Sequence, residues 1–190
     1  MVGKSGNRDG SVPGFWIDVL RMPKTLLAWP QWSDPNTRSA AMAAETTEVV
    51  IPLGTREGSG IQGAQLRLNA FAYRRMHEIT ATLEIGHGRL AVPISRVDGW
   101  PADPHMNHMA RKHARLRRVP AVVEGSHVHR LLDNARLGLK AFRPPHNLPI
   151  AVPLPEPLTS FRGFLRTVGR EFNIVNLEEF DPPPSQEYLL

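Results

Sequence analysis

The spacing of hydrophobic residues becomes strand-like after about residue 46. Residues 49–53 form a short apolar run that leads into a glycine-rich stretch. Residues 65–73 and 78–85 then alternate between apolar and polar side chains, as does the run 89–97. Between the last two runs, residues 86–88 read Gly-His-Gly, and glycine accepts the positive φ of a hairpin turn. This pattern predicts an antiparallel β-meander of three or four strands.

Alternation also predicts which side chains share a face of each strand. In the run 78–85 the apolar face holds Ile79, Ala81 and Leu83. In the run 89–97, strict alternation places Arg96 on the same face as Val92 and Ile94.

Helical spacing occurs in three other segments. Residues 15–22 form a short amphipathic pattern that Pro23 ends. Residues 103–118 begin with Asp-Pro and continue as a charged, unbroken run, which predicts a basic helix. Near the C-terminus, Thr159 or Ser160 can cap a helix with one apolar stripe, made of Phe161, Phe164, Leu165, Val168 and Phe172.

The segment 127–142 fits two structures. Its apolar residues suit a helix capped by Ser126, but its first five residues alternate and lead to a turn-like Asp133-Asn134. We favour a strand followed by a turn.

The sequence therefore predicts an α+β fold, an antiparallel β-meander with a basic helix and a C-terminal amphipathic helix. We expect an irregular N-terminal arm with a short helix over residues 1–45, a single α+β domain over 46–174, and an acidic, proline-rich tail over 175–190. Three of the four tryptophans lie in the arm, where they either cover an edge of the core or bind a partner.

Composition narrows the class of partner. The 190 residues carry a formal charge of +5 with a pI near 10.2, which favours an anionic partner such as nucleic acid or an acidic protein surface. The absence of cysteine excludes disulfides, thiolate metal sites and cysteine nucleophiles. No apolar run approaches the roughly 18 residues of a membrane helix, and the N-terminus lacks the order of a secretory signal, so we expect a cytoplasmic protein without membrane contact.

Histidine is the residue type most concentrated in one region, because all eight histidines lie between His77 and His146. Several fall in three short polar motifs, which are Arg96-Val97-Asp98, His105-Met106-Asn107-His108 and Gly125-Ser126-His127-Val128-His129. A strand would project His127 and His129 from one face, as a metal site or an acid–base pair requires.

Two kinds of site fit these motifs. His105 and His108 could join His127 and His129 in a metal shell, with Asp98 or Glu124 as the carboxylate. Because no motif of established metal-ligand spacing is present, we assign no metal and no cofactor. Binding of a divalent cation stays an open alternative.

The metal-free alternative is cleavage of RNA by its own ribose hydroxyl, which needs a base, an acid and a cation beside the phosphate. Histidine suits both proton-transfer roles near neutral pH. The candidate catalytic residues are His127, His129, His105, Arg96 and Asp98.

A basic run supplies candidate phosphate contacts, namely Arg111, Lys112, Arg115, Arg117, Arg118 and Arg130. The same charges would equally suit a solvated helix face. Tyr73 and Trp100 are candidates for stacking on bases.

The order of the motifs is similar to a pattern in small uncharacterised proteins of bacteria and their mobile elements. The residues that carry it are Tyr73 and His77, Arg96 and Asp98, His105 and Asn107, and Gly125, His127 and His129. The resemblance covers about a third of the chain and implies only that these polar residues form one site. Nothing matches a phosphate-binding loop, a Rossmann glycine motif, a serine nucleophile elbow or a zinc-protease helix.

Three functions are consistent with these observations. The first is a nucleic-acid-binding protein of a bacterial mobile element or defence locus, with RNA favoured, that acts as a histidine-dependent ribonuclease. The second is a non-enzymatic phage or defence protein that binds a nucleoprotein complex or a protein through its N-terminal arm and C-terminal tail. The third is a subunit of a larger complex whose histidines form a polar core network. The enzyme requires Arg96, Asp98, His105, His127 and His129 to converge.

Overall fold

The computed structural model describes residues 11–33, 36–37, 45–71 and 76–183. Its α-helices are α1 (Gly14–Arg21), α2 (Leu131–Ala135) and α3 (Phe161–Phe172). Its strands are β1 (Thr25–Leu26), β2 (Asn36–Thr37), β3 (Glu45–Gly54), β4 (Gly60–Phe71), β5 (Ile79–Ile85), β6 (Val92–Gly99), β7 (His105–Met106), β8 (Val122–Val123), β9 (His127–His129) and β10 (Val152–Pro153). Short 3₁₀ turns are η1 (Gly88–Leu90), η2 (Ala110–Lys112), η3 (Ala114–Leu116), η4 (Leu139–Phe142) and η5 (Leu177–Glu179).

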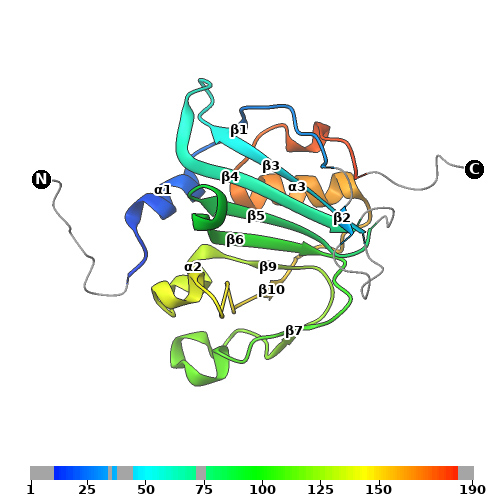
Figure 1. The fold of residues 1–190 in the computed structure, drawn as a ribbon. Coiled ribbons are helices and arrows are strands. Elements are labelled where there is room, and N and C mark those ends of the chain that lie inside the picture. The colour runs from blue at the N-terminus through cyan, green and yellow to red at the C-terminus, as the bar shows by residue number, and fades with distance from the viewer. Residues whose placement is uncertain (1–10, 34–35, 38–44, 72–75, 184–190) are drawn as a thin grey trace, which may run out of the picture.

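One antiparallel sheet organises the chain, with the strand order β1-β3-β4-β5-β6-β9-β10 and β2 also paired to β3 (Figure 1). Strands β7 and β8 form a separate two-stranded ribbon. The predicted α+β class, the antiparallel meander and the C-terminal helix are confirmed. No described helix combines the length and apolar character needed to cross a membrane.

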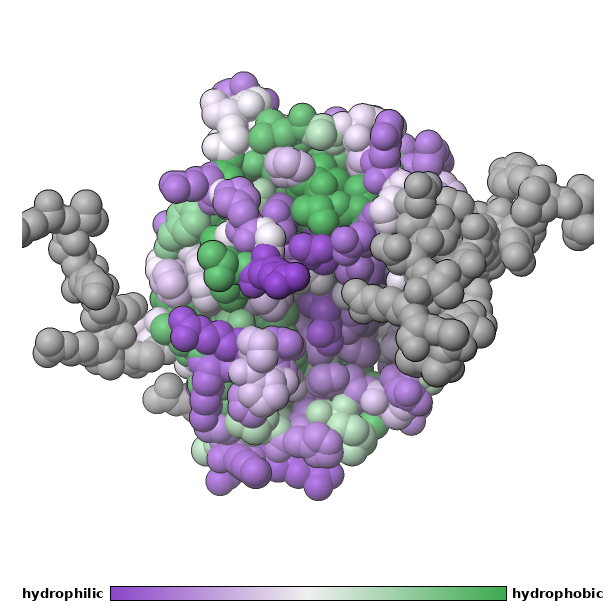
Figure 2. All heavy atoms as spheres, viewed as in Figure 1, coloured by the Kyte–Doolittle hydropathy of each residue, from purple (hydrophilic) through white to green (hydrophobic). Residues whose placement is uncertain are grey.

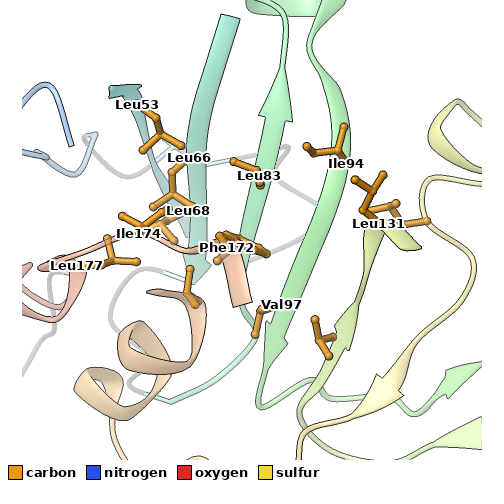
Figure 3. Packing of buried hydrophobic residues seen from close by; sticks show 14 of the residues in the cluster. Leu53, Leu66, Leu68, Leu83, Ile94, Val97, Leu131, Phe172, Ile174 and Leu177 are labelled. Atoms are coloured by element: carbon orange, nitrogen blue, oxygen red, sulfur yellow. The ribbon is translucent and has the colours of Figure 1, made fainter. Parts of the chain in front are cut away.

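The sheet has one apolar and one polar face. Helix α3 packs against the apolar face, which Figure 1 shows from the opposite side. Ser160 caps this helix, because its hydroxyl accepts a hydrogen bond from the Gly163 amide at 3.0 Å. Four residues of the predicted stripe are fully buried, namely Phe164, Leu165, Val168 and Phe172. Figure 3 shows Phe172 lying with Leu66, Leu68 and Leu83 of the sheet.

A β-bulge in β6 reverses the predicted orientation of Arg96. Leu83 pairs with Ser95, but the next residue of β5, Glu84, pairs with Pro93, so Ile94 is an extra residue in β6. Ile94 is buried beside Leu131 (Figure 3). The prediction from strict alternation was therefore wrong, and Arg96 lies on the polar face with Asp98.

The N-terminal residues that the structure describes pack on the rest of the chain. Helix α1 confirms the predicted helix at residues 15–22, and Val19 enters the core. Trp16 meets Phe142 edge to face at 5.1 Å between ring centroids, and Trp32 stacks on Phe180 at 5.3 Å. These two tryptophans cover edges of the core, whereas Trp29 is 65% exposed.

Two segments differ from their predicted structure. The expected basic helix over 103–118 is replaced by β7 and the two 3₁₀ turns η2 and η3. Among the residues of this segment whose burial the structure describes, only Asn107, Ala110 and Leu116 are buried, and their spacing gives no helical stripe. In 127–142, the favoured strand is confirmed as β9, but the helix α2 follows it where we expected a turn.

Candidate functional site

The pairing of β6 with β9 brings the predicted polar motifs together. Arg96 lies opposite His129, and Asp98 lies opposite His127. Directly opposed residues of antiparallel strands project from the same face, so all four side chains meet on the polar face. The ring of His105, from β7, lies 4.7 Å from that of His129 and 5.4 Å from that of His127 between centroids. The five candidate catalytic residues thus form one cluster.

The carboxylate of Asp98 lies at the centre of this cluster. Its Oδ2 accepts a hydrogen bond from Arg96 Nε at 2.9 Å and lies 3.1 Å from His127 Nε2 and 3.0 Å from His129 Nε2. Burial alone would raise the pKa of Asp98, but the contacts of both histidines and the charge of Arg96 outweigh burial and hold the pKa well below its usual range. Asp98 is therefore an anion.

Each histidine ring has one nitrogen against a backbone carbonyl. His127 Nδ1 lies 2.8 Å from the Gly125 oxygen, and His129 Nδ1 lies 2.6 Å from the Leu148 oxygen. His105 Nε2 lies 3.1 Å from the Pro149 oxygen. A carbonyl oxygen only accepts, so each of these nitrogens carries the hydrogen. In the neutral rings, the lone pairs are consequently on His105 Nδ1, His127 Nε2 and His129 Nε2.

The protonation of His129 follows from its surroundings. Burial lowers its pKa to about 4, because the hydrogen-bonding contact with Asp98 does not outweigh burial and the Arg96 charge. The ring is therefore neutral at pH 7, and its Nε2 accepts from Arg96 Nη2 at 2.7 Å. Burial likewise lowers the pKa of His105, although the Pro149 carbonyl opposes the shift. The neighbouring charges of His127 and Arg96 lower it further.

Two asparagines hold the segment that supplies two of the carbonyls. The Asn107 side chain donates to the Ala151 oxygen at 2.9 Å and accepts from the Ala151 amide at 2.8 Å. Asn134 makes the same pair of bonds with the backbone of Ile150, both at 2.9 Å. Both asparagines are fully buried. They fix the chain that presents the carbonyls of residues 148 and 149 to His129 and His105.

Backbone conformation at two residues also directs carbonyls at the rings. Gly125 has φ +66°, which explains the glycine of the Gly-x-His-x-His motif. Leu148 has φ +61°, a conformation that non-glycine residues rarely adopt. The Leu148 carbonyl contacts His129, so local strain coincides with the cluster. The motif glycine was visible in the sequence, but no sequence signal marked Leu148, Asn134 or the role of Asn107.

Exposure differs strongly within the cluster. The side chain of His129 is fully buried and that of His127 is 4% exposed, whereas that of Arg96 is 27% exposed. His105 is half-buried. The cluster is therefore open to solvent on the side of Arg96 and His105.

A hollow on the polar face adjoins the cluster. It has a volume of about 610 Å³ and is lined by residues of β3, β4 and β5, among them Glu48, Arg67, Asn69 and Thr80. Thr80 lies on β5 and pairs with Asp98 of the neighbouring strand β6. The hollow therefore ends one strand away from the Asp98 carboxylate. Figure 2 shows hydrophilic residues over the middle of this face.

The other predicted contacts fall in different places. Arg111, Lys112, Arg117 and Arg118 are exposed between β7 and β8, and Arg115 lies in η3 of the same segment. Arg130 forms a bidentate ion pair with Glu171 of α3, at 2.7 and 2.9 Å, which offsets its charge.

Trp100 is unsuited to stacking on a base, because its Nε1 donates to the Leu158 oxygen and its ring packs near Phe164. Tyr73 lies outside the described residues. His108 and Glu124 are exposed and do not belong to the group of close ligand atoms.

The chain matches no family model, no curated protein and no solved structure in comparisons with known proteins.

Proposed function

We propose that the protein binds RNA and cleaves it at the cluster of Arg96, Asp98, His105, His127 and His129. The observation that carries this proposal is the convergence of a guanidinium, a carboxylate and three imidazoles on the polar face of the sheet. The exposed basic residues between β7 and β8 belong to the same segment as His105 and would hold neighbouring phosphates.

Cleavage of a phosphodiester requires positive charge beside the phosphate and a group that takes the proton of the attacking hydroxyl. Arg96 is the partly exposed cation of the cluster and would contact a phosphate oxygen. The imidazole lone pairs would either take the proton directly or hold a divalent cation whose bound hydroxide takes it, and the resulting imidazolium or metal-bound water would protonate the leaving 5′ oxygen. Asp98 keeps Arg96 beside His129 through its hydrogen bond to Nε.

Incubation of the purified protein with end-labelled single-stranded RNA at low salt, with added Zn²⁺ and separately with a chelator, tests this function. We expect the wild type to cleave RNA in at least one condition. The cleavage rate of His105→Ala should be at least tenfold lower, because His105 is the half-buried imidazole on the accessible side of the cluster. The exposed His108 gives a matched control in His108→Ala, which should cleave normally. Intact RNA in every condition, or equal cleavage by both variants, contradicts the proposal.

A second candidate is a non-enzymatic protein that binds another protein. It is favoured by the exposed apolar side chains of Leu27, Trp29 and Val50, where Figure 2 shows hydrophobic residues over β1 and β3. Monomeric proteins seldom expose such a group without a partner. In that case Trp29→Ser would abolish binding of the partner, and substitution of His105 would leave it unchanged.

A further inference from the structure

The cluster contains more hydrogen-bond acceptors than donors. With the ring hydrogens directed at carbonyls, the inward atoms are the lone pairs of the three histidines and Oδ2 of Asp98. Arg96 supplies donors to only two of them, Asp98 Oδ2 and His129 Nε2. When the His127 ring is neutral, its Nε2 faces Asp98 Oδ2 at 3.1 Å with no hydrogen between them, whereas a second proton on the ring would join the two atoms in a hydrogen bond. Two acceptors at that distance repel unless a proton or a cation lies beside them.

We propose that His105, His127 and His129 bind a divalent transition-metal ion, with Zn²⁺ as the best match. The ligand atoms are His105 Nδ1, His127 Nε2 and His129 Nε2. One ligand atom from each histidine lies within 4.8 Å of the others. Tetrahedral ligands at about 2.0–2.1 Å from Zn²⁺ lie roughly 3.4 Å apart, so small rotations of the rings close the shell. Imidazole ligands in a chain without cysteine favour Zn²⁺ over Mg²⁺ or Ca²⁺.

The backbone contacts of the rings match those of metal-binding histidines. A histidine that binds a metal usually donates its other N–H to a carbonyl or carboxylate, which fixes the ring and raises its basicity. All three rings have such a carbonyl, and Asn107 and Asn134 hold two of the three carbonyls in place. In a polar core network each lone pair would accept from a donor, but among the described residues only the lone pair of His129 does so, from Arg96.

Arg96 is the competing cation. Its Nη2 lies 2.7 Å from His129 Nε2, so it must leave that nitrogen when a metal binds. Its 27% exposed side chain can turn toward solvent while the strand position stays fixed. Three protein ligands leave the fourth position of a tetrahedral ion for water or a phosphate oxygen, and Arg96 would then lie beside that ligand. Asp98, next to two of the rings, would accept a hydrogen bond from the bound water.

Binding of ZnCl₂ to metal-stripped full-length protein, followed by titration calorimetry, tests this site. We expect one Zn²⁺ per chain in the wild type and in His108→Ala, and at least a tenfold weaker affinity in His105→Ala and His105→Gln. Circular dichroism identifies variants that have lost the fold. Absence of stoichiometric binding by the wild type, or equal affinity in His105→Gln and His108→Ala, would overturn the proposal.

Co²⁺ absorption gives a second measurement that needs no variant to fold. A tetrahedral nitrogen site gives intense visible bands, whereas exposed histidines with mostly water ligands give weak ones. We expect the intense bands in the wild type and their displacement by one equivalent of Zn²⁺. Weak bands alone would mean adventitious surface binding and would overturn the site.

This inference does not depend on RNA cleavage. Stoichiometric Zn²⁺ binding without any cleavage refutes the proposed function and supports the metal site. Cleavage in the presence of a chelator by protein that binds no Zn²⁺ refutes the metal site and supports the function.

Discussion

Arg96 and His129 face each other across strands β6 and β9, with Arg96 Nη2 2.7 Å from His129 Nε2. This contact holds the positive charge of the Arg96 guanidinium against a nitrogen that we propose as a metal ligand. The residue that would hold a phosphate is thus also the residue that opposes the ion.

The Arg96→Met variant should separate these two effects. Removing the guanidinium frees His129 Nε2 and removes a nearby positive charge, so the affinity for Zn²⁺ should rise by roughly tenfold or more. The affinity for RNA and the cleavage rate should fall, because the cation beside the phosphate is lost. Calorimetry with Zn²⁺ and filter binding with RNA measure the two affinities. A fall in both would show that Arg96 holds the cluster together and does not compete with the metal.

The Gly125→Ala variant tests the backbone conformation that directs a carbonyl at His127. A Cβ at Gly125 would meet open space, so the expected cost comes only from φ +66° and is about 1 kcal/mol. For a chain of this size, such a loss lowers the melting temperature by about 2–4 °C. Gly14→Ala is the matched control, since Gly14 also has open space around it but begins helix α1. Equal melting temperatures in the two variants would contradict the argument.

The Asn107→Ala variant tests the segment that supplies carbonyls to the rings. It leaves the amide and the carbonyl of buried Ala151 without their partner, which should cost on the order of 3 kcal/mol of unfolding free energy. If the carbonyls orient metal ligands, affinity for Zn²⁺ should also fall by 10–100-fold. Urea unfolding and calorimetry measure the two effects, with Asn69→Ala in the hollow as the control. A loss of stability without a change in Zn²⁺ affinity would mean that Asn107 stabilises the fold but does not orient the metal ligands.

Lys24 should make stability depend on alkaline pH. This side chain is fully buried at the end of α1, where its Nζ donates to the carbonyls of Val19, Leu20 and Met22. Burial lowers its pKa from 10.5 to about 8. Between these two values the unfolded chain binds more protons than the folded one, so stability should rise with pH from 8 to 10.5.

Comparison with Lys24→Met isolates this effect. The difference in unfolding free energy between wild type and variant should shift in favour of the wild type by up to about 3 kcal/mol from pH 8 to 10.5. Urea unfolding at several pH values measures it. A flat difference would mean that the three carbonyls keep the ammonium charged and offset its burial.

Salt dependence tests the basic segment between β7 and β8. Replacement of Arg117 and Arg118 by alanine should reduce the slope of log affinity against log salt by about 1.4 for single-stranded RNA, if each contacts one phosphate. Arg166→Ala is the control, because Arg166 lies on α3 and pairs with Glu178. An unchanged slope in the double variant would mean that the RNA does not bind to this basic segment.

The strands and the helix α3 could be predicted because their signals are local. Alternation at Ile79, Ala81 and Leu83 and the cap at Ser160 depend on a few neighbouring residues. The prediction of a basic helix over residues 103–118 was wrong, because charge and an opening Asp-Pro do not stabilise a helix that has no apolar stripe to bury. Pairing of β7 with β8 and the bonds of Asn107 to Ala151 determine that segment instead.

The convergence of the motifs could be anticipated, but the origin of their geometry could not. Two bonds of Asn107 to Ala151 and two of Asn134 to Ile150 link residues that are 44 and 16 positions apart. The carbonyls of residues 148 and 149 belong to the backbone and leave no trace in residue types. Such contacts depend on tertiary structure, for which a single sequence contains no periodic signal.

The extra residue Ile94 has a consequence for recognising related proteins. The bulge absorbs this residue, so Val92 and Val97 both lie on the core side while Arg96 stays paired with Thr82 on the polar face. A relative without the extra residue would pair regularly through Pro93 and Ser95 and would present the same Arg-x-Asp motif on the same face, whereas an insertion that no bulge absorbs would turn the motif toward α3. The spacing between the Gly86-His87-Gly88 turn and the arginine can therefore differ by one residue among chains that share this cluster.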